Sequence, residues 1–480
     1  MANSQNSNES NNNVKNIEES SLIKAIVVSI FDAEGPTPKY YYPEDLDENS
    51  RLLIAMKTIS LLMGEATYQD GNAIEGVNYF GILPFPDIKL NGLTYFFLIF
   101  DPEARGQAKA ATITILVDEE NKSFFYDNIK YLRVIIDKSA SQIQNAKDSN
   151  EMKNILDSLR MQLLNFIKDL KHPFSQTRQI KILLAGLDRS GKSSFVLGIK
   201  KKYSEIIKVL PTKGVSREIS ELFGAQLIRW ELGGQKSYRD QYLKESEVYL
   251  YNVDLLFFLI DVQDLKRREE GLKYFKRLIE SLENIDDYPP IVLCLHKTDP
   301  DIKNEKRIRE NIEFIIMSIQ EFTQNYYIKI FETSIFDHWS LVSAFSYGIS
   351  RLSPNREIFR KQLEWFANKT DSEAILLLDE KAIILSNFSR DDVSGKVFEI
   401  SAPHFQTLYK TFKEFKILKK DFLVSSGISQ TKKILFKKLN IEKFNLYLLL
   451  FISSENFIER IDEYLDEFIS RIKMLIQTYI

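Results

Sequence analysis

Cysteine is almost absent from this sequence, since its 480 residues include only Cys294. A single cysteine cannot form an intramolecular disulfide or a cysteine-rich zinc site. Histidine is nearly as rare, and the four histidines lack the spacing of metal ligands: His172, His296, His338 and His404. The sequence therefore predicts neither a disulfide framework nor a zinc protein, and a reducing, cytoplasmic setting is expected.

Long apolar runs are also missing. The longest, 446–452, is far shorter than the roughly 20 residues that cross a bilayer. The polar N-terminal segment has no apolar core of a signal peptide. The formal net charge of −3 gives no reason to expect nucleic acid as a partner. We therefore expect membrane contact to be at most peripheral, through partners.

The chain is long enough for several domains, because single cores rarely grow beyond about 300 residues. Residues 1–20 are rich in Asn and Ser and are expected to form a disordered tail. The rest divides into an α+β domain over 21–148, a helical connector over 149–177, a central α/β domain over 178–355 and a second α+β domain over 356–480. The predicted element order is ββαβββαα for 21–171 and αββαβββα for 356–480.

The central block alternates strands with helices, as a doubly wound parallel sheet does. Within it, residues 186–193 read GLDRSGKS, which fits the pattern G-x-x-x-x-G-K-[ST] between a strand and a helix. Backbone N–H groups of such a loop surround a phosphate, helped by the positive end of the helix. Lys192 would reach the β- and γ-phosphates, and Ser193 would ligate Mg²⁺. The alternative is a chance turn of glycine and serine, and the downstream segments argue against it.

Two downstream segments have the composition of nucleotide-sensing loops. The segment WELGGQ, 230–235, supplies a carboxylate, two glycines and a glutamine after a predicted strand. Glu231 would help to hold Mg²⁺ through water, the Gly234 N–H would contact a γ-phosphate, and Gln235 would orient the attacking water. Thr212, in the segment LPTKG, would add its hydroxyl to Mg²⁺ when a γ-phosphate is present.

Two further segments indicate the base. In HKTD, 296–299, the carboxylate of Asp299 can accept two hydrogen bonds from guanine, whereas adenine offers no such pair of donors. The segment ETSIFD, 332–337, follows the next predicted strand. The expected nucleotide-binding residues are Gly186, Asp188, Arg189, Ser190, Gly191, Lys192, Ser193, Ser194, Thr212, Gly234, His296, Lys297, Asp299, Ser334 and Ile335. The expected Mg²⁺ ligands are Ser193, Thr212 and Glu231, and the expected catalytic residue is Gln235.

These motifs resemble those of the Ras-like small GTPases, in particular the Arf and Rag branches. GLDRSGKSS, PTKG and WELGGQ are similar to the Arf loops, whereas HKTD and ETSIFDHWSLVSAFSYGISRLSPN are similar to those of Rag proteins. The first block, with FDAEGPTPKYYYP, is similar to a longin domain, and the last block is similar to a roadblock domain. The resemblance implies a GTP/GDP switch with Mg²⁺ as cofactor, whose flanking domains dimerise and recruit partners in trafficking or nutrient-type signalling.

Three residues bear on how active such a GTPase would be. Glu231 replaces the usual aspartate and His296 the usual asparagine, while Asp188 stands where many Ras-like proteins have glycine. We expect slow, activator-dependent hydrolysis, with the exchange factor and the activating protein unidentified. Arg189 and Arg217 are candidates for an arginine finger, although solvated surface charge is the preferred interpretation of each.

Two alternatives stay open. The chain could be a scaffold that holds nucleotide with little or no hydrolysis, which Glu231 and Asp188 favour and Gln235 disfavours. It could also be an ATP-using enzyme, which Asp299 disfavours. The predicted roadblock-like sheet is expected to pair with a second copy or a paralogue, because open sheet edges invite pairing.

Overall fold

The computed structural model describes residues 22–63, 78–102, 104, 107–146, 149–169, 179–222, 225–324, 326–391, 405–415, 422–426, 433–442, 444–452 and 457–479. The tail predicted over 1–20, part of the predicted connector, His172 and His404 lie outside these residues. The chain forms two compact units. The first contains the N-terminal part up to residue 178 together with 354–370 and 456–480, and the second contains 179–353 and 371–455.

The described residues of the first unit form a five-stranded antiparallel sheet with the order β2-β1-β5-β4-β3. Its strands are β1 (Ile23–Asp32), β2 (Gly35–Tyr42), β3 (Tyr79–Phe85), β4 (Leu90–Phe100) and β5 (Ala108–Asp118). The turn between β1 and β2 is short, because β2 already begins at Gly35. Its two prolines, Pro36 and Pro38, are tolerated because β2 lies at the edge of the sheet.

Helices cover both faces of this sheet. They are α2 (Glu48–Met63), α3 (Ser123–Asp127), α4 (Ile129–Gln144) and α5 (Ser149–Asp169), with the short 3-10 helices η2 (Pro86–Ile88) and η3 (Glu119–Asn121). On one face, the hydroxyl of Thr58 in α2 lies 3.2 Å from that of Thr112 in β5. On the other, Leu132 of α4 and Leu159 of α5 join the main apolar core. The first of the two helices that the predicted order ββαβββαα places after the last strand is divided between α3 and α4.

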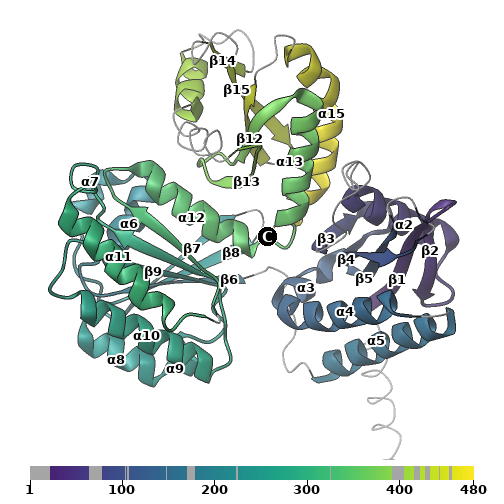
Figure 1. Cartoon of the computed structure of the whole chain (residues 1–480), viewed down its shortest axis with the longest axis horizontal. Helices are drawn as coiled ribbons and strands as arrows, with labels where there is room; N and C mark the ends of the chain where they lie inside the picture. The colour runs from purple at the N-terminus through teal and green to yellow at the C-terminus, as the bar shows by residue number, and fades with distance from the viewer. Residues whose placement is uncertain are drawn as a thin grey trace, which may run out of the picture. The chain divides into compact units, whose positions relative to one another are not determined.

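Two helices from the C-terminal third of the sequence complete the first unit. These are α13 (Arg356–Thr370) and α15 (Phe457–Ile476), which pack against each other and against β3 (Figure 1). Asn355, just before α13, is fully buried and bonds to both the N–H and the carbonyl of Ile82 in β3. Its Nδ2 also donates to the carbonyl oxygen of Thr478 at 2.9 Å. One edge of the N-terminal sheet is therefore covered from within the same unit.

The central sheet belongs to the second unit and has the order β11-β10-β9-β6-β8-β7. Its strands are β6 (Gln179–Gly186), β7 (Val215–Leu222), β8 (Ala225–Leu232), β9 (Leu255–Asp261), β10 (Ile291–His296) and β11 (Ile328–Thr333). All neighbouring pairs are parallel except β7 with β8. The expected purely parallel sheet is thus corrected at this edge, because the interval 223–224 is too short for a parallel crossover.

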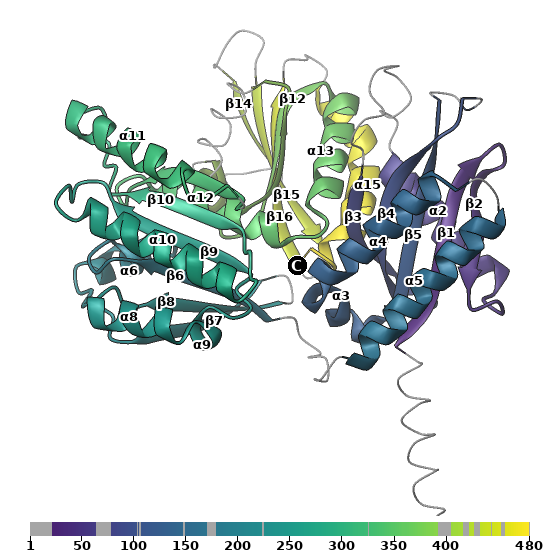
Figure 2. The ribbon, with the colours of Figure 1, turned by 60° about the horizontal axis from the view of Figure 1, so that its bottom comes forward.

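Helices lie on both faces of the central sheet, as predicted for a doubly wound fold. The helices are α6 (Lys192–Ile199), α7 (Tyr203–Ile206), α8 (Lys236–Lys244), α9 (Ser246–Tyr249), α10 (Arg268–Asn284), α11 (Lys306–Gln320) and α12 (His338–Leu352). Helices α6 and α12 pack together, while α10 packs with α8 and α11 around a second apolar core (Figures 1 and 2). The loop before α6 follows β6 and the loop before α8 follows the parallel strand β8, so both loops lie at the carboxyl end of the sheet.

A third sheet, of order β13-β12-β16-β15-β14, completes the second unit. Its strands are β12 (Ser372–Leu378), β13 (Ile384–Ser389), β14 (Phe422–Ser426), β15 (Lys433–Ile441) and β16 (Phe444–Ile452), with helical residues at 405–414. Numbered within each part, this sheet and the N-terminal one share the strand order 2-1-5-4-3. The predicted element orders of the two flanking parts agree with the observed ones in the described residues. Among the described helices, none is both long and apolar enough to cross a bilayer.

Candidate functional site

The loop between β6 and α6 has the geometry of a phosphate-binding loop. Gly191 caps α6 in the left-handed region, with φ +92°. A Cβ at this position would lie 2.4 Å from Cδ2 of His296, so the loop packs directly on that imidazole. Gly191 and the first three residues of α6 line the adjacent cavity, and the N-terminal end of a helix favours an anion there.

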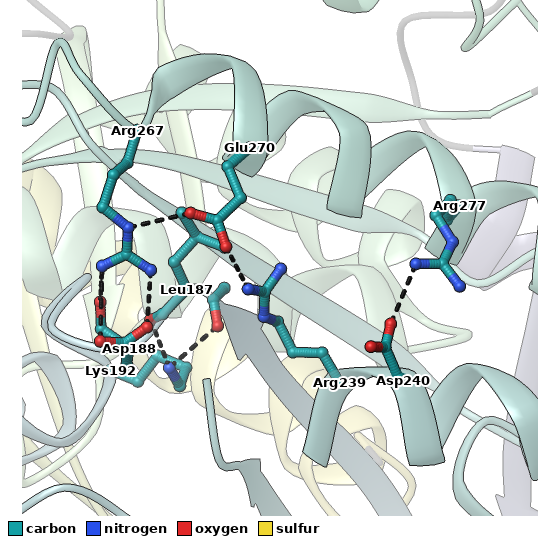
Figure 3. Close-up of polar contacts among 9 residues, drawn as sticks. Leu187, Asp188, Lys192, Arg239, Asp240, Arg267, Glu270 and Arg277 are labelled. Atoms are coloured by element: carbon teal, nitrogen blue, oxygen red, sulfur yellow. Dashed lines mark hydrogen bonds and ion pairs between the residues drawn. The ribbon is translucent and has the colours of Figure 1, made fainter. Parts of the chain in front are cut away.

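Lys192 is held under this loop by the backbone. Its Nζ donates to the carbonyl oxygens of Gly186 at 3.1 Å and Leu187 at 2.9 Å (Figure 3). Burial lowers the pKa of Lys192 to about 8, against the opposing charges of Glu231 and Asp188. A phosphate would raise this pKa again, since it would supply the negative charge that the buried ammonium lacks.

Three oxygen-bearing side chains converge beside Lys192. Oε1 of Glu231 accepts hydrogen bonds from Ser193 Oγ and from Thr212 Oγ1, the latter at 2.9 Å. The two hydroxyl oxygens are 3.5 Å apart. These are the three predicted Mg²⁺ ligands, and the structure brings them together from α6, the 210–214 loop and β8. Hydroxyl and carboxylate oxygens with room for phosphate fit Mg²⁺, which binds few protein groups and keeps several waters.

The cluster opens into a cavity of about 410 Å³, which lies in the range of small-molecule sites. Its lining residues are Asp188, Arg189, Gly191, Lys192, Ser193, Ser194, Val209, Leu210, Pro211, Thr212, Glu231, Gly234, Gln235 and Lys297. Eleven of the predicted site residues thus line one cavity. Ten of them lie around the starts of α6 and α8 and in the 210–214 segment, and the eleventh is Lys297. Gly186, Ser190, His296, Asp299, Ser334 and Ile335 do not belong to this lining in the described part of the chain.

Gly234 brings the second loop against the phosphate loop. Its carbonyl accepts from the Asp188 N–H at 3.0 Å. A Cβ on Gly234 would lie 2.0 Å from Asp188 N, a separation that no side chain could adopt. Gln235 follows as the N-cap residue of α8, exposed and lining the cavity.

The predicted base-recognition residues lie at the ends of β10 and β11. The Asp299 carboxylate accepts from Ser334 Oγ at 2.5 Å and from Gln263 Nε2 at 2.9 Å. Lys297 forms an ion pair of 2.6 Å with Asp261. Both oxygens of Asp299 thus already act as acceptors for protein donors, as they would for guanine. Ile335 is half-buried beside Ser334.

His296 packs against the phosphate loop at Gly191. The ring is almost completely buried, and its Nδ1 lies 2.9 Å from Thr333 Oγ1. Burial, with a smaller contribution from the charge of Lys297, lowers the pKa of His296 to about 3, so the ring is neutral near pH 7.

The sequence reasoning missed Gln263 and Thr333, which contact Asp299 and His296. Gln263 is separated from Asp299 by 36 positions, so local spacing gave no signal. Of the two arginine-finger candidates, Arg189 lines the cavity, and its φ of 61° places it in the left-handed region. Arg217 stacks on Trp230, with 3.9 Å from Cζ to the ring centre, which agrees with a surface role.

Comparisons with known proteins locate the family of this region. Residues 181–403 match the family described as the Gtr1/RagA G protein conserved region. The central part of the chain is a Ras-like small GTPase domain of the Arf and Rag type. The resemblance inferred from the motifs is thereby confirmed for this GTPase domain.

Several relatives of the GTPase domain are similar over part of their length. ADP-ribosylation factor F of Dictyostelium discoideum is 28% identical over 28% of this chain and 69% of its own length. ADP-ribosylation factor-like protein 3 of Caenorhabditis elegans is 37% identical over 23% of the chain and 56% of its length. ADP-ribosylation factor-like protein 14 of Mus musculus is 32% identical over 25% of the chain and 59% of its own length. The chain thus spans between 56% and 69% of the length of these relatives.

A solved structure is also similar to part of the chain. The Arl6 BBS3 small GTPase from Trypanosoma brucei, with bound nucleotide analogue GppNp, is 19% identical, with a TM-score of 0.30. The match covers 36% of this chain and 97% of the Arl6 chain.

Proposed function

We propose that this chain is a guanine-nucleotide switch that binds GTP and GDP with Mg²⁺ and hydrolyses GTP slowly. The observation that carries the proposal is the convergence of Ser193, Thr212 and Glu231 beside Lys192, at the mouth of a nucleotide-sized cavity. Membership of the GTPase family supports the switch, and the guanine preference is inferred from the paired acceptors of Asp299.

Each residue would have a separate task in this switch. The loop before α6 and Lys192 would hold the β- and γ-phosphates, and Gln235 would orient water from the start of α8. Ser193, Thr212 and Glu231 would hold Mg²⁺, which neutralises phosphate charge when bound. Because Thr212 and Gln235 belong to two different loops, loss of the γ-phosphate would release both from the same centre.

The first experiment is Mg²⁺-dependent binding of fluorescent GDP and GTP to the full chain, with unlabelled ATP as competitor. We expect guanine-selective binding that weakens in Asp299→Asn. Asp301→Asn is the matched control, because Asp301 is exposed and lies two positions beyond Asp299. Displacement of GTP by ATP would contradict the guanine assignment, and loss of binding in both variants would contradict the role of Asp299.

Hydrolysis is tested separately, by single-turnover phosphate release from bound GTP in the wild type and in Gln235→Leu. We expect release in the wild type, faster with cell extract that supplies activators, and much slower but measurable release in the variant. Equal, negligible rates with extract would favour the scaffold interpretation, in which nucleotide is held without turnover.

The flanking sheets support a further proposal of dimerisation and partner recruitment in the cytoplasm by longin-like and roadblock-like domains. Both sheets have the strand order 2-1-5-4-3, which gives each of them two end strands. Asn355 and Thr478 cover the β3 edge of the N-terminal sheet, so we assign pairing to other edges. A monomeric mass at micromolar concentration in both nucleotide states would contradict this proposal.

A further inference from the structure

Gln235 is held on both sides by a single residue of the phosphate loop, Asp188. On the N-terminal side, the backbone N–H of Asp188 donates to the carbonyl of Gly234 at 3.0 Å. Gly234 immediately precedes Gln235, so this bond fixes the chain just before the proposed catalytic side chain. The anchor on the C-terminal side is longer and runs through the Asp188 carboxylate.

This second anchor is a chain of charged side chains (Figure 3). Nη2 of Arg267 donates to Asp188 Oδ1 at 2.6 Å, and Nη1 of Arg267 lies 3.4 Å from the Asp188 backbone oxygen. Nε of Arg267 donates to Oε2 of Glu270 at 3.0 Å. The other oxygen of Glu270 accepts from Nη2 of Arg239, which comes from α8.

Arg239 connects this series of side chains to Gln235 through the backbone. The backbone N–H of Arg239 donates to the Gln235 carbonyl at 3.0 Å, as expected one helical turn along α8. The Arg239 side chain is 8% exposed and lies over the ring of Tyr274, 5.1 Å from its centre. Arg239 and Tyr242 are the buried residues of α8, so the Arg239 side chain joins Glu270 to the inner face of this helix.

We propose that Arg267 is a positioning residue for GTP hydrolysis, which holds the first turn of α8 and Gln235 in place relative to the phosphate loop. The inference rests on the proposed hydrolysis. Arg267 does not itself line the cavity, and Asp188 is the lining residue that it bonds, so it acts through Asp188 and Glu270.

The chemistry of the guanidinium explains why arginine suits this position. Two of its edges bond two different carboxylates at once, whereas a lysine ammonium is a point charge on a flexible stem. Burial disfavours the charged form of Asp188, but the hydrogen bond and charge of Arg267 outweigh it and keep the pKa of Asp188 below its usual value. Burial also disfavours the charged form of Glu270, but the hydrogen bonds and charges of Arg267 and Arg239 outweigh it and lower the pKa of Glu270. Both carboxylates therefore stay ionised at neutral pH.

A second ion pair between the same two helices provides a matched control. Arg277 of α10 and Asp240 of α8 are 3.1 Å apart at exposed positions (Figure 3). This pair also joins α10 to α8, but within the described residues neither of its side chains bonds to the phosphate loop. Loss of Arg277 therefore removes a helix-to-helix ion pair without removing the anchor on Asp188.

The experiment compares Arg267→Gln, Arg267→Lys and Arg277→Gln in the full chain. We expect both Arg267 variants to slow single-turnover hydrolysis roughly 10- to 100-fold, because small misplacements of catalytic groups have effects of that size. GDP affinity should stay within about twofold of the wild type, and Arg277→Gln should match the wild type in both. In a Gln235→Leu background, Arg267→Gln should have no further effect. A wild-type rate in Arg267→Lys, or an additive effect in the double variant, would overturn the proposal.

Hydrogen exchange gives a readout that does not need turnover. The amides of Asp188 and Arg239 form the two anchoring bonds, so both should exchange faster in Arg267→Gln and at the wild-type rate in Arg277→Gln. If the wild type binds GTP but releases no phosphate, the proposed hydrolysis fails, and exchange alone decides the positioning. Unchanged exchange at both amides would overturn it.

Discussion

Replacement of Asn355 by alanine tests how the edge of the N-terminal sheet is closed. The Asn355 side chain is fully buried, and its Oδ1 accepts from the Ile82 N–H at 2.7 Å. Its Nδ2 donates to the Ile82 carbonyl at 2.9 Å and to both oxygens of Thr478, at 2.9 and 2.8 Å. The amide thus serves β3 as a neighbouring strand would, although it comes from the start of α13.

The free-energy cost can be worked out from these contacts. Loss of the two Nδ2 hydrogens removes about 1 kcal/mol each, since a typical hydrogen bond contributes that much to stability. The Ile82 carbonyl keeps the hydroxyl of Thr478 at 2.6 Å, but the Ile82 N–H is left buried without an acceptor, at about 1–3 kcal/mol. We therefore expect Asn355→Ala to destabilise this edge by about 3–5 kcal/mol.

Native-state hydrogen exchange of the Ile82 amide measures this cost, because local opening controls that amide. At 1.4 kcal/mol per factor of ten, exchange should accelerate roughly 100- to 4,000-fold in Asn355→Ala. Asn355→Asp keeps the acceptor and should protect the amide better, although its charge faces two carbonyl oxygens. Asn49→Ala is the control, because Asn49 is exposed in the same unit. A change below about tenfold, or an equal change in the control, would refute the reasoning.

Three further variants test the GTPase domain. His296→Asn should flatten the pH dependence of stability. Above the unfolded pKa of about 6.5 the histidine is neutral in both states and the buried ring costs nothing. As pH falls from 6.5 toward 3, the histidine is protonated in the unfolded state only, so stability is lost. That loss is about 2 kcal/mol at pH 5, and urea unfolding at pH 7 and pH 5 measures it; an equal slope in the variant would contradict it. Glu231→Gln should weaken Mg²⁺ binding ~10–100-fold, measured as the Mg²⁺ concentration that slows GDP release; an unchanged midpoint would remove Glu231 from the metal site. Gly234→Ala should break the bond to Asp188 and slow hydrolysis while GDP stays bound; a wild-type rate would mean that the two loops need not touch.

Much of the GTPase domain could be predicted because its chemistry is local in sequence. The phosphate loop needs a strand, a glycine turn and a helix in immediate succession. Residues 186–193 are therefore sufficient to predict it without any distant residue. The 212 and 230–235 segments could be assigned because each carries a residue type that Mg²⁺ or water requires. The antiparallel strand β7 was not predicted, since its residues alternate weakly and its pairing depends on the short link to β8.

The remaining site residues could not be predicted, because their partners are distant in sequence. Arg267 and Asp188 are 79 positions apart, and nothing in the spacing of LKRREE identifies which arginine meets the phosphate loop. The packing of α13 and α15 against the N-terminal sheet could not be predicted for the same reason. An amphipathic helix shows which face is buried, but it does not show against which sheet.

Asn355 and the chain from Asp188 through Arg267 to Glu270 both join backbone segments through side chains, and they differ in their response to salt and pH. Asn355 is neutral and fully buried, so its edge should be insensitive to salt and to moderate pH. The chain from Asp188 through Arg267 to Glu270 is roughly one third exposed, so solvent screens it and its strength falls as salt rises. If Arg267 positions Gln235, hydrolysis should slow with ionic strength in the wild type more than in Arg267→Gln, at saturating nucleotide. A salt dependence equal in both proteins would mean that the ion pairs do not control the first turn of α8.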